Sequence, residues 1–206
     1  MIWAVSDSLV NWKILTMSTV VVVRKNNGAC IAADSLTSFG DTKQAAEFVV
    51  HSDKIIRFDA FYMGIVGSAA HQLVLKSLFK NHANKIDFSN QLSIFESVKL
   101  IHPILKDEYF LNSKDEDEDP YESSRVDSLI MTNKGIYGLY SLREVDEYTQ
   151  FWAVGSGAEY ALGAMFSVYD QLETAEQIAQ AGVHAGAKFD NASDLPMTSY
   201  TVELTD

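Results

Sequence analysis

Four strand-like stretches follow one another near the start of the chain, and a polar residue or a glycine turn stands at an end of each. Apolar residues dominate residues 19–24, 29–33, 54–58 and 61–66. The turn signal Asn26-Asn27-Gly28 separates the first two stretches and predicts a β-hairpin over residues 19–34. The groups at the strand ends are a hydroxyl, a carboxylate, an ammonium and a glycine turn, namely Ser18, Asp34, Lys54 and Gly67-Ser68-Ala69-Ala70.

These four groups are what an enzyme needs if its nucleophile is its own first residue. A serine hydroxyl is a poor nucleophile unless a base takes its proton, and a free α-amine, with a pKa of about 7.7–8.0, is a suitable base. A charged Lys54 nearby would favour the neutral amine, and Asp34 is the candidate to hold that lysine. A glycine turn at Gly67 can present a backbone N–H to a tetrahedral intermediate without steric obstruction. The pattern therefore predicts an enzyme with Ser18 as its N-terminal nucleophile.

Five segments, taken in order, resemble a known family. Residues 18–34 resemble the mature N-terminus of proteasome β-subunits and of their bacterial relative HslV, in which a catalytic threonine is followed by an aspartate and then a lysine. The other segments are similar to the family's lysine-led strand, glycine turn, Gly-Ser-Gly and Asp-x-x-Ser: Lys54-Ile55-Ile56-Arg57, residues 64–70, Gly155-Ser156-Gly157 and Asp190-Asn191-Ala192-Ser193. The resemblance covers nearly everything after Met17, and the bacterial single-subunit branch, HslV or the bacterial proteasome homologues, is the most similar.

The resemblance implies an N-terminal-nucleophile endopeptidase that uses no cofactor and no metal. The implied catalytic residues are Ser18, Asp34, Lys54, Gly67, Ser156, Asp190 and Ser193. The implied substrate-binding residues have small to medium, apolar side chains, which favour apolar substrate residues: Thr37, Ile56, Ile65 and Ala69. Ser18 stands where the family has threonine, and it offers the same hydroxyl and amine without the methyl group that restricts χ1.

The resemblance also implies an assembly and partners. Family members form closed rings, usually stacked in pairs, whose sites face an inner chamber. Six-fold and seven-fold rings both occur, and the sequence does not choose between them. Unfolded proteins or peptides are the implied substrates, and an ATP-driven unfoldase such as the one that serves HslV is a possible partner.

The residues before Ser18 divide the chain into an extension, residues 1–17, and a single catalytic domain, residues 18–206. Self-cleaving propeptides of the family usually end in glycine, whereas Met17 precedes Ser18 here. In the simplest account translation begins at Met17, and removal of this initiator exposes Ser18. The alternative is an unusual propeptide.

Composition limits the other classes of function. The net charge of −12, without a basic run, argues against nucleic-acid binding. No stretch approaches the roughly 18–20 apolar residues of a membrane helix. The single Cys30 excludes an internal disulfide and fits a reducing, cytoplasmic compartment, and we expect it to be buried in a strand. The acidic run at residues 114–120 is predicted to be a solvated loop, and the histidines show no zinc spacing.

Periodicity predicts an α+β fold. Helices are expected over residues 68–81, with Leu73 and Leu78 on the same side, and over 88–111, 158–170 and 175–189. Pro103 should kink the second helix or end a segment, and Thr174-x-x-Gln177 is a capping box for the last. Further strands are predicted at 126–132, 135–141, 151–154 and 199–204, and residues 35–47 read as loop-rich. This order suits a four-layer αββα sandwich, two antiparallel sheets between helix layers, as the resemblance to N-terminal-nucleophile hydrolases also implies.

Simpler roles remain open for several of these residues. Ser156-x-x-Glu159 is itself a capping box, and Asp34 could cap a turn. Asp190 lies in a turn-rich stretch and could be solvated. Two other functions also remain: an N-terminal-nucleophile amidohydrolase acting on a small amide, or a non-catalytic ring or scaffold protein in which Ser18 is never exposed.

Overall fold

The expected hairpin forms the centre of the molecule. The computed structural model describes residues 17–39, 42–111 and 126–205. Strand β1 (Val20–Lys25) pairs with β2 (Gly28–Asp34) in antiparallel register around the Asn26-Asn27 turn. The first four valines of β1 are fully buried. Val20 and Val22 belong to one apolar cluster, and Val21 and Val23 belong to another on the opposite face of the strand. This two-sided burial explains why the strand is an unbroken apolar run.

Two larger antiparallel sheets lie face to face in the described part of the chain. One has the strand order β10-β1-β2-β11, where β10 is Phe151–Val154 and β11 is Met197–Glu203. The other has the order β5-β6-β7-β8-β9. Its strands are Ile55–Phe58, Phe61–Val66, Asp127–Thr132, Ile136–Tyr140 and Glu144–Tyr148.

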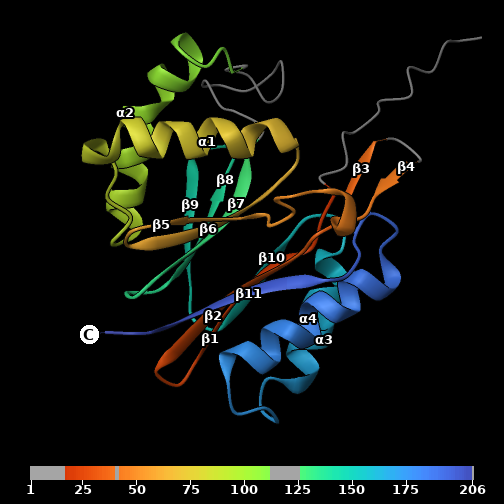
Figure 1. Ribbon diagram of the computed structural model, residues 1–206. Coiled ribbons are helices and arrows are strands. Elements are labelled where there is room, and N and C mark those ends of the chain that lie inside the picture. Colours follow the sequence, from red (N-terminus) through yellow and green to blue (C-terminus); the bar gives the residue numbers. More distant parts are fainter. Residues whose placement is uncertain (1–16, 40–41, 112–125, 206) are drawn as a thin grey trace, which may run out of the picture.

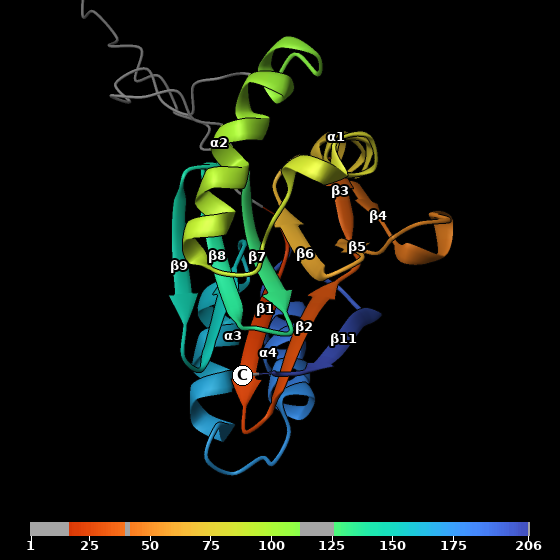
Figure 2. The same cartoon turned by 90° about the vertical axis from the view of Figure 1, so that its left-hand side faces the viewer.

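Helix pairs cover the outer faces of both sheets, as Figures 1 and 2 show. Helices α1 (Ala69–Asn81) and α2 (Gln91–Asp107) pack on the five-stranded sheet, and α3 (Ala158–Val168) and α4 (Ala175–Phe189) pack on the four-stranded sheet. Separate apolar clusters fill the space between the sheets and beneath each helix layer. The predicted α+β, four-layer αββα sandwich is confirmed.

Most predicted elements are present, and the differences have local causes. Leu73 is 73% exposed, because Leu75 and Leu78 form the buried side of α1 instead. Helix α2 continues through Pro103 to Asp107. The segment predicted to be loop-rich contains a short strand pair, β3 (Thr37–Phe39) and β4 (Thr42–Gln44). Two short 3-10 turns lie at Ala46–Phe48 and Ala83–Lys85. The edge strand β9 was not predicted.

Other sequence expectations have different outcomes. The capping box of Thr174 and Gln177 opens α4 as predicted, and Cys30 is buried in β2. Residues 1–16 and the acidic run at 114–120 lie outside the described residues. Among the helices of the described residues, none has the length and apolar character needed to span a bilayer. The same residues contain no cluster of three or more His, Cys, Asp and Glu side chains suited to a metal ion.

Candidate active site

The hairpin register brings Ser18 and Asp34 to the same end of the four-stranded sheet. Val20 is opposite Ala33, so the residue before β1 lies beside the last residue of β2. The backbone N–H of Thr19 donates to Asp34 Oδ1 at 2.9 Å, and the Asp34 N–H donates to the Thr19 carbonyl at 3.1 Å. The carboxylate is therefore fixed beside the serine by the pairing of the two strands.

Lys54 joins these two residues from the edge of the other sheet. Its Nζ atom lies 2.7 Å from Asp34 Oδ1 and 2.9 Å from Ser18 Oγ. The Lys54 side chain is 13% exposed and that of Asp34 is fully buried. Burial lowers the pKa of the Lys54 ammonium below its ordinary 10.5, and the nearby charge and hydrogen bond of Asp34 partly offset this effect.

The buried carboxylate of Asp34 has further hydrogen bonds. Its Oδ2 atom accepts from the backbone N–H of Leu36 at 3.0 Å and of Asp194 at 3.1 Å. Asp34 thus orders the turn that follows it, as its alternative role predicts, and also holds Lys54. These partners compensate for the loss of water around a buried charge.

A chain of hydroxyl groups reaches the nitrogen of Ser18. This N–H donates to Ser156 Oγ at 3.3 Å, and Ser156 Oγ donates to Asp190 Oδ2 at 2.7 Å. Ser193 Oγ donates to the same carboxylate oxygen at 2.6 Å and lies 2.8 Å from Thr19 Oγ1. Asp190 is half-buried, and it links the segment before α3 to the segment after α4.

The capping alternative for Ser156 is wrong. Helix α3 begins at Ala158 after the N-cap residue Gly157, and no side chain caps it. The hydroxyl of Ser156 is directed to Asp190 and to the Ser18 nitrogen instead.

Backbone conformation makes glycine necessary at two positions. Gly67, the expected oxyanion donor, follows β6 with φ 102°, and Gly155 follows β10 with φ 98°. Both angles lie in the left-handed region that side chains disfavour. A Cβ atom on Gly155 would also collide with the carbonyl of Ser18.

Sequence reasoning missed the role of Thr19. Its side chain is fully buried, and Gly157 and Gly186 pack directly against its hydroxyl, where a Cβ atom would collide. The threonine looked like an ordinary strand residue, because Gly157, the N-cap of α3, and Gly186 of α4 lie far along the chain. A small residue at the start of α3 and another within α4 is the signal that could have found it.

The implied substrate-binding residues do not form one open surface. Ile56 and Ile65 are 2% and 7% exposed, because they face the core beneath α1 and α2. They therefore offer a substrate almost no surface here. Ala69 is exposed in the first turn of α1, and Thr37 is half-buried in β3. The preference for apolar substrate residues stays a prediction.

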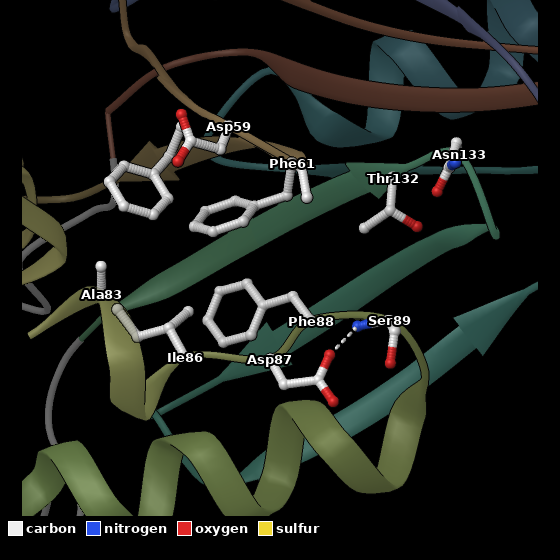
Figure 3. Close-up of a pocket in the computed structure, with 11 residues that line it drawn as sticks. Asp59, Phe61, Ala83, Ile86, Asp87, Phe88, Ser89, Thr132 and Asn133 are labelled. Atoms are coloured by element: carbon white, nitrogen blue, oxygen red, sulfur yellow. Dashed lines mark hydrogen bonds between the residues drawn. The ribbon is translucent and has the colours of Figure 1, made fainter.

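A cavity in the structure lies away from these residues. It is formed between the β5–β6 turn, the segment before α2 and the end of β7, with the rings of Phe61 and Phe88 on its walls (Figure 3). Asp87 also lines it and accepts from the N–H of Ser89. None of the implied site residues lines this cavity.

Comparison with known proteins identifies the fold and the family. The family of proteasome subunits matches residues 15–195. The chain belongs to the proteasome family. As a member of this family with a shared αββα fold, it is a peptidase of the N-terminal-nucleophile hydrolase type. No curated protein matches the chain.

Solved structures of proteasome-family proteins have the same fold as this chain. Thiobacillus denitrificans BPH in complex with epoxomicin is 39% identical, with a TM-score of 0.85 over 91% of this chain and 100% of that one. Another structure of the same BPH, also 39% identical, has a TM-score of 0.83 over 91% and 98% of the two chains. HslV from Trypanosoma brucei, at 20% identity, a TM-score of 0.67 and coverage of 90% and 99%, shares the fold. The resemblance to HslV and the bacterial proteasome homologues is confirmed.

Proposed function

We propose that this protein hydrolyses peptide bonds with Ser18 Oγ as nucleophile and the freed α-amine of Ser18 as base. The observation that carries the proposal is the position of Lys54 Nζ, 2.9 Å from Ser18 Oγ and 2.7 Å from Asp34 Oδ1. A cation at this position favours loss of the hydroxyl proton and disfavours protonation of the amine. Ser156 accepts from the Ser18 nitrogen, and in our proposal Ser156, Asp190 and Ser193 together order a catalytic water.

The proposed reaction has two halves. The amine, directly or through a water, takes the proton of Ser18 Oγ, and the oxygen forms a bond to the peptide carbonyl carbon. The backbone N–H of Gly67 stabilises the oxyanion. The C–N bond then breaks as the protonated amine gives its proton to the leaving nitrogen. In the second half water attacks the ester carbon and gives a proton to the amine. The bond between Ser18 Oγ and that carbon then breaks, the amine passes the proton to Ser18 Oγ, and the acid product leaves.

This mechanism requires that residues 1–17 be removed. In the intact chain the Ser18 nitrogen belongs to a peptide bond and Ser18 is only 3% exposed. Loss of an initiator Met17 or cleavage of a propeptide would expose the amine of the catalytic domain, residues 18–206. Intact-mass measurement and N-terminal sequencing of the protein from its native host test this step. A peptidase-active chain that still begins at Met1 contradicts the N-terminal nucleophile.

Hydrolysis of fluorogenic peptides tests the nucleophile. Ser18→Ala should abolish turnover, because it removes the hydroxyl but leaves the fold intact. The matched control is Ser167→Ala, a serine in α3 whose hydroxyl donates to the Ala164 carbonyl of the same helix, and this variant should keep full activity. Full turnover by Ser18→Ala contradicts the mechanism. Since the related BPH binds epoxomicin, we also expect this compound to raise the melting temperature of the processed wild-type protein.

The proposal includes a closed ring of copies, by analogy with the family. Head-to-tail contacts that close by rotation produce such rings. Sedimentation and native mass spectrometry of the processed protein test the assembly, and a persistent monomer at micromolar concentration contradicts the ring. A panel of peptides and small amides separates a peptidase from a small-molecule amidohydrolase. An ATP-driven unfoldase partner, and a cytoplasmic location for both, are further parts of the proposal.

A further inference from the structure

The residue immediately before Lys54 connects the edges of the two sheets. Strand β5 is an edge of the five-stranded sheet and β11 is an edge of the four-stranded sheet. Asp53 Oδ1 accepts from Thr198 Oγ1 of β11 at 2.9 Å and from the N–H of Ile55 at 2.8 Å. Its Oδ2 atom accepts from the hydroxyl of Tyr200, also in β11, at 2.5 Å. We call Asp53, Thr198 and Tyr200 the edge clasp.

Neighbouring groups fix both parts of the edge clasp. The side-chain amide of Gln72 in α1 donates to the Asp53 carbonyl at 2.5 Å. The Tyr200 ring stacks on Tyr62 of β6 with centroids 5.1 Å apart, and the Arg57 guanidinium lies 5.2 Å from its centroid. Burial, together with the hydrogen bond and charge of Asp53, raises the pKa of the Tyr200 hydroxyl, which keeps it protonated as a donor.

The same strand β11 is in register with the carboxylate that binds Lys54. Met197 is opposite Asp34, so Thr198 follows directly after the pair. The N–H of Asp194, just before β11, donates to Asp34 Oδ2. Strand β11 therefore pairs with Asp34 through its first residue, Met197, and bonds Asp53 through the next residue, Thr198. This arrangement sets the separation between the backbone of Lys54 and its carboxylate partner.

We propose that Asp53 is a positioning residue for Lys54, acting through Thr198 and Tyr200, an inference that rests on the proposed function of Ser18. The backbone of Lys54 is held on its other side by the N–H of Ile65, which donates to the Lys54 carbonyl at 3.3 Å. With the edge clasp in place, the ammonium reaches Ser18 Oγ and Asp34 together. Without it, the residue before Lys54 has no side-chain anchor to the second sheet.

Loss of the edge clasp should change the chemical step and its pH dependence. The charged groups facing Lys54 are Asp34 and Asp190, and both remain in an Asp53 variant. A displaced ammonium no longer disfavours protonation of the Ser18 amine, so the pKa of that amine rises toward its ordinary value of about 7.7–8.0. Since the neutral amine is the active form, the acid limb of kcat/KM moves to higher pH. A displacement of about 1 Å lowers kcat by about 10- to 100-fold, with KM little changed.

The test uses processed, assembled protein and fluorogenic peptides across a pH series. Asp53→Ala should lower kcat and move the acid limb upward, whereas Asp53→Asn, which still accepts from Ile55 and Thr198, should fall between it and the wild type. The double variant Thr198→Val/Tyr200→Phe keeps the carboxylate but removes its partners, and it should reproduce most of the change. Asp59→Ala removes an exposed carboxylate from the β5–β6 turn and serves as the control, with wild-type values expected.

The outcomes separate the two proposals. If Asp53→Ala lowers only the melting temperature and its folded fraction keeps the wild-type kcat and pH profile, Asp53 does not position Lys54. If Asp53→Ala fails to fold, Asp53→Asn and the double variant decide, and wild-type pH profiles in both overturn the inference. Activity in Ser18→Ala would instead remove the proposed function itself, whatever the Asp53 variants do.

Discussion

Thr19 and Lys54 bind the same oxygen atom of Asp34. The backbone N–H of Thr19 lies 2.9 Å from Asp34 Oδ1, and Lys54 Nζ lies 2.7 Å from it. The residue that follows Ser18 and the cation beside its hydroxyl are therefore positioned by one acceptor. A change at Asp34 should disturb both at once.

Asp34→Asn should lower kcat/KM by about 10²- to 10³-fold, because the amide neither balances nor orients Lys54 in the same way. It should also move the alkaline limb of the pH profile. The Asp34 charge raises the pKa of Lys54 against the lowering effect of burial. Without that charge the lysine loses its proton at lower pH, so activity falls earlier as pH rises. Peptidase assays between pH 6 and about 10 measure both effects.

In the wild-type enzyme, the midpoint of the alkaline limb should lie below pH 10.5, since burial lowers the pKa of Lys54 from that value. An alkaline limb in Asp34→Asn that coincides with the wild-type limb contradicts the role of the carboxylate in keeping Lys54 charged.

Ser156→Ala should reduce kcat by about 10- to 100-fold, with a smaller effect on KM. The change removes the acceptor of the Ser18 nitrogen and the donor to Asp190 but leaves Lys54 and Asp34 in place. Steady-state peptide kinetics measure the loss. Because α3 is not capped by this side chain, the melting temperature should stay close to the wild-type value. A large fall in melting temperature with normal kcat would indicate a structural role.

Gly186→Ala should destabilise the protein by about 1–3 kcal/mol, because its methyl group would collide with the buried side chain of Thr19. Gly163→Ala is the matched control in α3, since an added Cβ there meets nothing within 4 Å beyond its chain neighbours and the backbone of its own helix. The control should be neutral or stabilising by up to about 1 kcal/mol. Urea unfolding at one fixed protein concentration compares them. Equal midpoints for the two variants contradict the packing of Thr19 against α4.

Thiol reagents should leave peptidase activity unchanged in the native protein. Cys30 is fully buried in β2, and burial raises the pKa of its thiol to about 12, so almost no reactive thiolate forms near neutral pH. Mass spectrometry after iodoacetamide treatment should find Cys30 unmodified until the protein is denatured. Rapid modification in the native state, or parallel loss of activity, contradicts this prediction.

Local sequence patterns predicted the first half of the site. Ser18 and Asp34 come together because a single hairpin with a readable turn separates them. Lys54 is at the start of the next strand, and its approach needs only that the two sheets face each other. The capping box at Thr174 is likewise a local signal, and it fixed the start of α4.

The other half depends on long-range packing that spacing does not encode. Asp190 reaches Ser156 because α3 and α4 lie side by side, and only the resemblance to the family indicated this pair. Asp53 was not singled out from the sequence, because its partners in β11 follow far along the chain. Leu73 was misplaced for a related reason, since helical spacing alone did not distinguish it from Leu75 as the core residue.

The hydroxyl chain has a consequence for timing during protein synthesis. Ser156 lies 138 positions beyond Ser18, and Ser193 lies 174 positions beyond Thr19. Ribosomes release the N-terminus first, so a partly translated chain carries Ser18 long before these hydroxyls exist. With Ser18 as the proposed attacking group, a nascent chain therefore lacks part of the proposed catalytic site until synthesis has passed Ser193.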